Sequence, residues 1–388
     1  MKSRDAESKR GTRNHKVESG NMRRFEPLDA RAGAVHNNAL AFVSDPPRRI
    51  LVKEVNWLGD LVMSLPALRG VRRAWPDAHL AVLVKKELVS FFDGAAWLDE
   101  VIPYSVGRGL SGFMDRRRIV GEIRTRKFDL GVLFPNSFES ALWLAMAGIK
   151  RRAGFVGDAR SALLTLKASP PPEALNHHQV NYWLAMLRET GVADGDAGDF
   201  AIDVAETHRE RMREFLAAKR RRAGAPIFAI APAAAYGPAK EWPADRYGAL
   251  IDLLARRDDA EVVLVGAPSE RAKCEEVAAS SKSGAIVAAG STNIGELIAL
   301  LSLCDGFIGN DSGCAHIAGA LGIPTVAIFG STNPERTGPL GAKARVIYRK
   351  LECSPCLART CRFGHYNCLT QIEAAELVDA IEMLRADL

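Results

Sequence analysis

Short apolar runs alternate with longer amphipathic stretches along most of the chain. Apolar runs of about 4–8 residues are typical of strands buried on both faces of a parallel sheet, and the longer stretches repeat at helical spacing. In the first half this predicts strands at Ile50–Val55, His79–Val84, Phe128–Phe134 and Arg152–Val156, and helices at Leu61–Trp75, Phe113–Arg124, Ser137–Met146 and Gln179–Glu189.

One highly charged segment interrupts the alternation before it restarts. Residues 203–223 have the pattern of a charged helix, and Gly224 and Pro226 follow it, which indicates a domain boundary. Beyond it the pattern predicts strands at Ile227–Pro232, Glu261–Gly266, Ala285–Ala289, Gly306–Gly309 and Thr325–Phe329, and helices at Ala244–Arg256, from Ser269, and at Ile294–Leu303, Gly313–Leu321 and Glu373–Ala386.

Two such units predict an α/β protein with two Rossmann-like, doubly wound domains that face each other across a cleft. Ligands of such sheets bind beyond the carboxyl ends of the strands, so polar residues that follow strands are the candidate site residues. We expect a disordered basic tail at 1–48, an N-terminal domain at 49–204, a linker helix at 205–225, a C-terminal domain at 226–372, and a helix at 373–388 that packs on either domain.

The composition is globular and mildly basic. Of the 388 residues, 47% are hydrophobic and 25% are charged, and the net charge of +6 favours anionic ligands without requiring nucleic acid. No apolar run reaches the ~18 residues of a membrane span, and no apolar core follows the basic N-terminus, so we expect a cytosolic protein without a secretory signal. The tail either solubilises the chain or attracts it to an anionic membrane face.

A strand-to-helix turn in the second half is the first candidate for chemistry. Asp311, Ser312 and Gly313 lie where a predicted strand ends and a helix begins. Asp311 or Ser312 can cap the helix, whose free N–H groups and dipole favour a phosphate oxygen, and Gly313 lets a ligand approach the backbone. His316, one turn later, could point toward a bound anion. The alternative is an ordinary capped turn with a surface histidine.

Two charged residues follow other predicted strands. Lys240 lies on a Gly/Pro loop after the strand that ends at Pro232, where it is either a diphosphate ligand or one more solvated lysine. Gly59 and Asp60 follow the first strand. Asp60 is either a helix N-cap or a general base that faces the cleft, ionised at neutral pH.

Seven cysteines in a cytosolic chain are expected as thiols or metal ligands rather than as disulfides. Four of them are spaced C-x2-C-x4-C-x6-C, which fits a structural zinc, less well an iron–sulfur cluster, or else a reduced and partly buried loop. These four are Cys353, Cys356, Cys361 and Cys368, and the core is expected to hold the others, Cys274, Cys304 and Cys314.

Five segments, in order, resemble the bacterial ADP-heptose:lipopolysaccharide heptosyltransferases of glycosyltransferase family 9, best the heptosyltransferase II type. The resemblance covers Arg49 to Leu388. The segments are NWLGDLVMSLPALRGVRRAWP, LFPNSFESALWLAMAGIKRRAGF, YGPAKEWP, NDSGCAHIAGALGIPTVAIFGSTNPERTGPLG and CSPCLARTCRFGHYNCLTQI.

The resemblance implies a GT-B fold and an inverting transfer of L-glycero-D-manno-heptose from ADP-heptose to the lipopolysaccharide inner core, without a required metal ion. It implies a cytoplasmic enzyme, peripheral on the inner face of the inner membrane. Asp60 matches the family's candidate base. The donor side matches Lys240, Asp311, Ser312, Gly313 and His316, with Glu270 for the adenosine ribose, and the acceptor side matches Gly59, Asn136, Ser137 and Arg152.

An anionic acceptor would also give a role to a basic cluster in the first half, which is otherwise a solvated helix face. The cluster consists of Arg116, Arg117, Arg118, Arg124, Arg126 and Lys127.

Two alternatives to a transferase remain: a sugar-nucleotide epimerase of the same architecture, and a catalytically silent nucleotide-sugar-binding protein.

Overall fold

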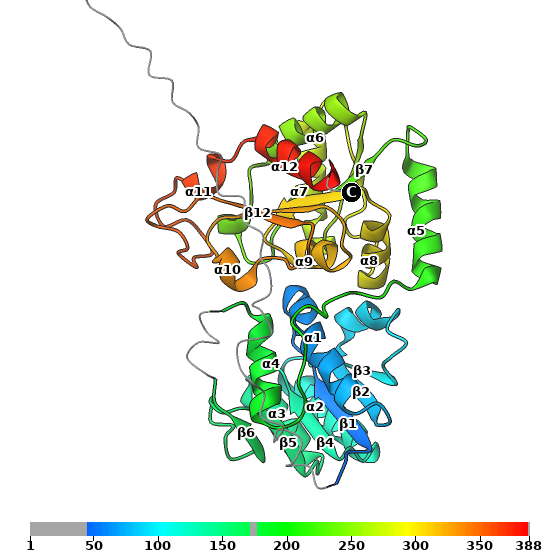
Figure 1. Ribbon diagram of the computed structural model, residues 1–388, viewed down its shortest axis with the longest axis vertical. Helices are drawn as coiled ribbons and strands as arrows, with labels where there is room; N and C mark the ends of the chain where they lie inside the picture. The colour runs from blue at the N-terminus through cyan, green and yellow to red at the C-terminus, as the bar shows by residue number, and fades with distance from the viewer. Residues whose placement is uncertain (1–44, 171–176, 387–388) are drawn as a thin grey trace, which may run out of the picture.

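The computed structural model describes residues 45–170 and 177–386, so the tail predicted at 1–48 lies almost entirely outside the described residues. The chain forms two parallel six-stranded sheets, each covered by helices, in two domains stacked along the long axis of the molecule (Figure 1). The predicted α/β class with two doubly wound domains is therefore confirmed.

The first sheet has the strand order β3-β2-β1-β4-β5-β6, and every pair in it is parallel. Its strands are β1 (Arg49–Lys53), β2 (His79–Lys85), β3 (Glu100–Tyr104), β4 (Leu130–Leu133), β5 (Arg151–Phe155) and β6 (Leu166–Ala168). Its helices are α1 (Leu58–Ala74), α2 (Gly109–Thr125), α3 (Phe138–Met146) and α4 (Val180–Glu189), with the 3-10 helix η2 (Lys86–Phe92).

The second sheet has the order β12-β11-β10-β7-β8-β9 and is also parallel throughout. Its strands are β7 (Ile227–Ala231), β8 (Glu261–Leu264), β9 (Ile286–Val287), β10 (Gly306–Asn310), β11 (Thr325–Phe329) and β12 (Ala344–Tyr348). Its helices are α6 (Ala244–Asp258), α7 (Arg271–Ser280), α8 (Ile294–Ser302), α9 (Gly313–Ala320), α10 (Pro334–Thr337), α11 (Asn367–Thr370) and α12 (Ala374–Ala386), with η4 (Pro238–Lys240) and η5 (Pro268–Glu270).

Every predicted strand and helix is present, and the strands that the pattern missed are β3, β6 and β12. All three are edge strands. An edge strand is covered less completely than a central one, so it carries a weaker apolar signal and tolerates residues such as Pro103 in β3 and Arg345 in β12.

Two helices remain to be placed: one links the two domains, and the other follows the last strand of the second sheet. The charged linker helix is α5 (Glu206–Lys219), which lies beside α8, where Arg211 pairs with Glu296 at 2.8 Å (Figure 1). The final helix α12 packs on the second domain, because Val378 and Ile381 belong to the core that also contains Leu250 of α6. The packing partner of α12, which the pattern left open, is thus the C-terminal domain.

The two domains touch directly. One apolar cluster continues from Leu61 of α1 in the first domain to Ile317 of α9 in the second. Hydrogen bonds cross the same boundary, from the Gly295 N–H to Ser90 Oγ at 3.2 Å and between His178 Nε2 and the Gly338 carbonyl at 2.8 Å. No helix in the described ranges combines the length and apolarity needed to cross a bilayer.

Candidate active site at the domain junction

The amino end of α1 carries Asp60 to the junction. The N-cap of α1 is Trp57, so Asp60 lies inside the first turn, and of its two alternative roles the helix cap is excluded. Its carboxylate has no hydrogen bond or ion pair among the described residues, and its electrostatic neighbour is Lys240 of the second domain. A half-buried, unbonded carboxylate at a helix amino end is available to accept a proton.

The amino end of α9 lies opposite. Ser312 is its N-cap, but the serine side chain makes no capping hydrogen bond and its buried hydroxyl has no partner within the described residues. The predicted side-chain cap is therefore absent. First-turn N–H groups that no side chain caps, together with the helix dipole, favour an anion at this position.

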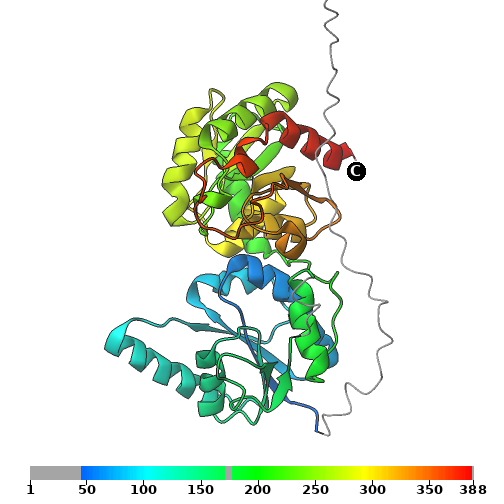
Figure 2. The ribbon, with the colours of Figure 1, turned by 90° about the vertical axis from the view of Figure 1, so that its left-hand side faces the viewer.

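Glycines allow the amino ends of α1 and α9 to meet. Figure 2 shows α1 directly below the second domain. A Cβ on Gly59 would lie 3.0 Å from His316 Cδ2, and a Cβ on Gly313 would lie 2.9 Å from the Leu58 Cβ. A larger residue at Gly313 would push the helices apart, and one at Gly59 would displace the His316 imidazole. The sequence predicted a close approach of a ligand to Gly313, and in the structure the close approach is that of α1.

Lys240 is held against the α9 turn. Its Nζ lies 2.5 Å from Asp311 Oδ2, and Thr332 donates a hydrogen bond to the same oxygen at 2.5 Å. The Nζ also lies 4.9 Å from the centroid of the Tyr236 ring. Asp311 is 6% exposed, so its carboxylate positions the lysine rather than facing solvent. The predicted association of the lysine loop with the Asp311–His316 turn is confirmed.

A buried asparagine anchors this loop to the sheet. Asn310, the last residue of β10, accepts hydrogen bonds from the Trp242 N–H at 3.0 Å and the Tyr247 hydroxyl at 2.9 Å. Its amide donates to the Pro232 carbonyl at 2.7 Å. Both ends of the loop that carries Lys240 are therefore tied to one side chain, which limits its freedom to move.

The junction alters the proton affinity of its titratable groups. Burial raises the pKa of Asp60, and the nearby Lys240 cation partly offsets that rise. Burial lowers the pKa of His316 to about 4, and burial also lowers the pKa of His178. Both imidazoles are therefore neutral near pH 7, and His316 is buried at the junction rather than on the helix surface.

Sequence reasoning missed three residues of this site. Thr332 and Tyr236 contact Asp311 and Lys240, and His178 bonds to Gly338 across the domain boundary. Tyr236 lies within the YGPAKEWP segment and Thr332 within the segment that begins NDSG, so both could have been found from the sequence. Thr332 follows β11, so the rule that residues after strand ends form sites would have found it.

Glu270 is the remaining predicted donor residue. Glu270 ends η5, and its carboxylate accepts a hydrogen bond from the Ala267 N–H at 2.7 Å. In this structure the Glu270 carboxylate therefore bonds to the backbone of its own 3-10 turn, and its contact with the adenosine ribose stays a prediction.

The predicted acceptor residues are only partly brought together. Ser137 caps α3, as expected, by accepting from the Ser140 N–H at 3.3 Å. Asn136 is held by Arg160 at 2.8 Å and by Tyr182 at 2.6 Å.

Arg152 lies near the amino end of β5, away from the carboxyl edge that carries Asp60, and its guanidinium donates to the carbonyls of Ile149, Lys150 and Leu163. This placement does not support an acceptor role for Arg152.

The cysteine segment was predicted to hold a structural zinc. Among the described residues, no group of three or more His, Cys, Asp or Glu side chains is arranged to hold a metal ion. Cys353, Cys356 and Cys361 are nevertheless electrostatic neighbours of Cys368, so the zinc site stays a prediction. The other three cysteines are buried, as predicted.

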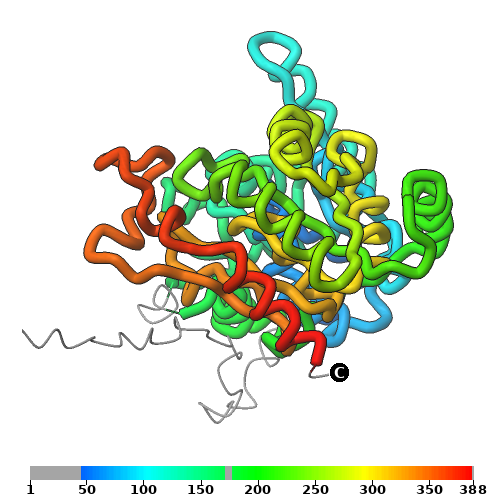
Figure 3. The backbone as a smooth tube through the Cα atoms, turned by 90° about the horizontal axis from the view of Figure 1, so that it is seen from above, coloured from blue at the N-terminus to red at the C-terminus, as the bar shows by residue number. Residues whose placement is uncertain are grey.

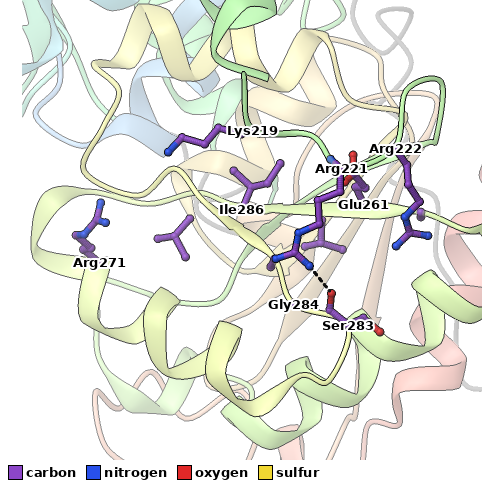
Figure 4. A pocket seen from close by; sticks show the side chains of 12 residues that line it. Lys219, Arg221, Arg222, Glu261, Arg271, Ser283, Gly284 and Ile286 are labelled. Atoms are coloured by element: carbon purple, nitrogen blue, oxygen red, sulfur yellow. Dashed lines mark hydrogen bonds between the residues drawn. The ribbon is translucent and has the colours of Figure 1, made fainter. Parts of the chain in front are cut away.

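A basic pocket of about 340 Å³ lies elsewhere, at the outer edge of the second sheet beside β9 (Figure 4). Its basic side chains are Lys219, Arg221, Arg222 and Arg271, and Arg221 donates to the Ser283 carbonyl at 3.4 Å. None of the candidate site residues lines it, so we assign it no part in the chemistry at the junction.

The paired helix ends, with a free carboxylate on one side and a held cation on the other, agree with comparisons to known proteins. The family described as glycosyltransferase family 9 (heptosyltransferase) matches residues 116–367. The chain belongs to glycosyltransferase family 9. It is therefore a glycosyltransferase with the GT-B fold, and the epimerase and silent-binding alternatives are set aside.

Several family 9 relatives cover most of the chain. The lipopolysaccharide heptosyltransferase 2 of Salmonella typhimurium is 30% identical over 310 residues, which span 77% of this chain and 87% of the relative. The E. coli ADP-heptose lps heptosyltransferase II structure has a TM-score of 0.75 at 26% identity and covers 87% of this chain and 99% of its own. A family 9 structure from Veillonella parvula, 23% identical, shares the fold with a TM-score of 0.77 over 88% of this chain and 98% of its own.

Proposed function

We propose that this chain transfers L-glycero-D-manno-heptose from ADP-heptose to the inner core of lipopolysaccharide, with inversion at the anomeric carbon. Relatives of 30% identity that carry the name lipopolysaccharide heptosyltransferase 2 support the donor and acceptor classes. The observation that carries the proposal is the placement of Asp60 within electrostatic range of Lys240, from opposite domains.

The roles follow from the geometry. The acceptor hydroxyl oxygen attacks the anomeric carbon, and its proton passes to the Asp60 carboxylate. The bond between the anomeric carbon and the phosphate oxygen breaks, and ADP leaves with the electron pair. Lys240 and the uncapped amino end of α9 stabilise the charge that grows on the diphosphate. Because these groups supply positive charge themselves, we propose that the reaction needs no metal ion, and transfer should survive a chelator.

The position of Asp60 suits a base. Burial raises its pKa, which makes the carboxylate a stronger base, and the nearby Lys240 cation partly offsets that rise. Contact between the domains would also exclude water, which could otherwise hydrolyse the donor. Because the acceptor is a lipid, we propose that the enzyme works peripherally on the inner face of the inner membrane.

The test is transfer to truncated lipopolysaccharide acceptors, followed by mass spectrometry. We expect Asp60→Asn to lower kcat/KM by about 10²–10⁴-fold, the usual contribution of a general base, while ADP-heptose binding measured by calorimetry stays within a few-fold of wild type.

The matched control is Asp77→Asn, an exposed aspartate at the opposite end of α1. Transfer that survives in Asp60→Asn at the wild-type rate would contradict the base assignment. Wild-type enzyme that transfers no heptose to any of these acceptors would contradict the function.

A further inference from the structure

The first turns of α2 expose an apolar stripe that no part of the described chain covers. Leu110, Phe113 and Met114 are 78%, 55% and 65% exposed. Their spacing of three and four residues puts them on one face of the helix, and Arg117 extends that face by one turn. The opposite face is the buried one, with Gly112, Ile119, Val120 and Ile123. We call Leu110, Phe113 and Met114 the α2 stripe.

Arginines flank the α2 stripe. The Arg117 guanidinium lies 5.9 Å from the centroid of the Phe113 ring. Within the described ranges, neither Arg108 nor Arg117 has a carboxylate partner.

The nearby carboxylates are already engaged. Asp115 accepts from Arg118 at 3.3 Å and from the Gly107 N–H at 3.0 Å, and Glu139 pairs with Arg116 at 2.5 Å. Glu122 lies about two helical turns beyond Met114, outside the stripe. The surface around the stripe is therefore apolar at its centre and positively charged at its border.

The stripe lies at the same edge of the first sheet as the catalytic aspartate. The helix α2 follows the carboxyl end of β3, where the Tyr104 hydroxyl donates to Asn56 Oδ1 at 2.7 Å, just before α1. The segment that leads into α2 projects from the body of the molecule (Figures 2 and 3). A flat surface could therefore meet the stripe without meeting the rest of the protein first.

We propose that the α2 stripe is a membrane-contact surface, which inserts Leu110, Phe113 and Met114 into an anionic bilayer while Arg108 and Arg117 contact lipid phosphates. An apolar face bordered by arginines is the composition of helices that lie in the bilayer interface. The choice of a bilayer over a protein partner rests on the proposed function, in which the acceptor is a lipid. Contact here holds the acceptor edge, with Asp60, at the membrane surface.

Vesicle flotation with the full-length chain tests this. We expect wild type to float with vesicles of phosphatidylethanolamine and phosphatidylglycerol, and to float poorly with phosphatidylcholine alone. The variant Leu110→Ser/Phe113→Ser/Met114→Ser should lose about tenfold or more of the anionic-vesicle binding, because three apolar side chains no longer enter the bilayer. Arg117→Ser should weaken binding more at low than at high salt.

Matched controls carry the same substitutions at other exposed sites. Met146→Ser/Met383→Ser removes two exposed methionines, 50% and 56% exposed, from α3 and α12. Lys219→Ser removes a cation from the basic pocket beside β9. Both should bind vesicles as wild type does. Equal loss in the controls and the stripe variant would overturn the proposal, and so would a stripe variant that binds like wild type.

Two further measurements separate this inference from the proposed function and from self-association. Transfer to an acceptor embedded in vesicles should fall in the stripe variant, whereas transfer to a deacylated acceptor in solution should not change. Loss of transfer to both acceptors would contradict a pure docking role for the stripe. A wild-type dimer, seen by sedimentation and broken by the stripe variant without any change in vesicle binding, would assign the stripe to a second copy instead.

Discussion

Lys240 and Asp311 form an ion pair in which Nζ lies 2.5 Å from Oδ2, although they come from separate loops of the second domain. Because Thr332 donates to the same carboxylate oxygen, the lysine is already in position before a ligand arrives. A diphosphate at the α9 amino end would therefore compete with Asp311 for the cation rather than having to order a free side chain.

Removal of this cation should weaken donor binding. We expect Lys240→Met to lower the affinity for ADP-heptose by about 10- to 100-fold, because a hydrogen bond between charged groups contributes about 1.5–3 kcal/mol. Calorimetry with the donor measures the change. Lys273→Met, which removes a surface lysine paired with Glu276 on α7, is the control and should bind normally. Unchanged affinity in Lys240→Met would exclude the lysine from the donor site.

The same variant should shift the pH dependence of transfer. The base must be deprotonated, so kcat/KM falls as the pH drops through the pKa of Asp60. Lys240 lowers that pKa, so its removal raises the pKa further and moves the acid limb to higher pH. Rates measured from about pH 4 to about pH 9 in wild type and Lys240→Met test this. An acid limb that stays in place, or moves to lower pH, would show that the two groups are not coupled.

The glycines at the helix ends should differ in their tolerance of a methyl group. In Gly313→Ala the new Cβ would meet the Leu58 Cβ at 2.9 Å, so the helices must separate. In Gly59→Ala it meets the imidazole of His316 at 3.0 Å, which needs a smaller shift.

We therefore expect Gly313→Ala to lose more transfer activity and more thermal stability than Gly59→Ala, with an overpacking cost of about 1–3 kcal/mol. Gly121→Ala, where a Cβ meets nothing within 4 Å, is the control. The reverse order of the two junction variants would contradict the contact.

The buried His316 should make stability depend on pH. Its pKa is about 4 in the folded chain against a usual 6.5, so between these values the unfolded chain binds the proton and the folded chain does not. Stability is therefore lost as the pH falls from about 6.5 to about 4, by up to about 3 kcal/mol from this group.

Urea unfolding at several pH values checks the prediction. His316→Gln should flatten this part of the profile relative to wild type, whereas the exposed His365→Gln should leave the slope unchanged. The prediction fails if the His316→Gln profile is as steep as that of wild type.

The sequence by itself determined the fold class and the strand ends at which the site lies. Continuous apolar runs identify central parallel strands, because only strands covered on both faces need to be apolar throughout. The carboxyl-edge rule then selected Asp60, Lys240 and Asp311, which the structure brings together. The same signal weakens at sheet edges, where β3, β6 and β12 were missed and only β9 was found.

Only the tertiary structure decided what each of these residues contacts. Spacing along the chain could not show that Asp311 holds Lys240, that Asp60 is no cap, or that Arg152 lies away from the acceptor edge. Nor could it show that His316 is buried against Gly59 at the junction. The local pattern of apolar and polar residues indicates whether a position is buried and where the backbone turns. Contacts between residues far apart in the chain depend instead on how two complete domains pack.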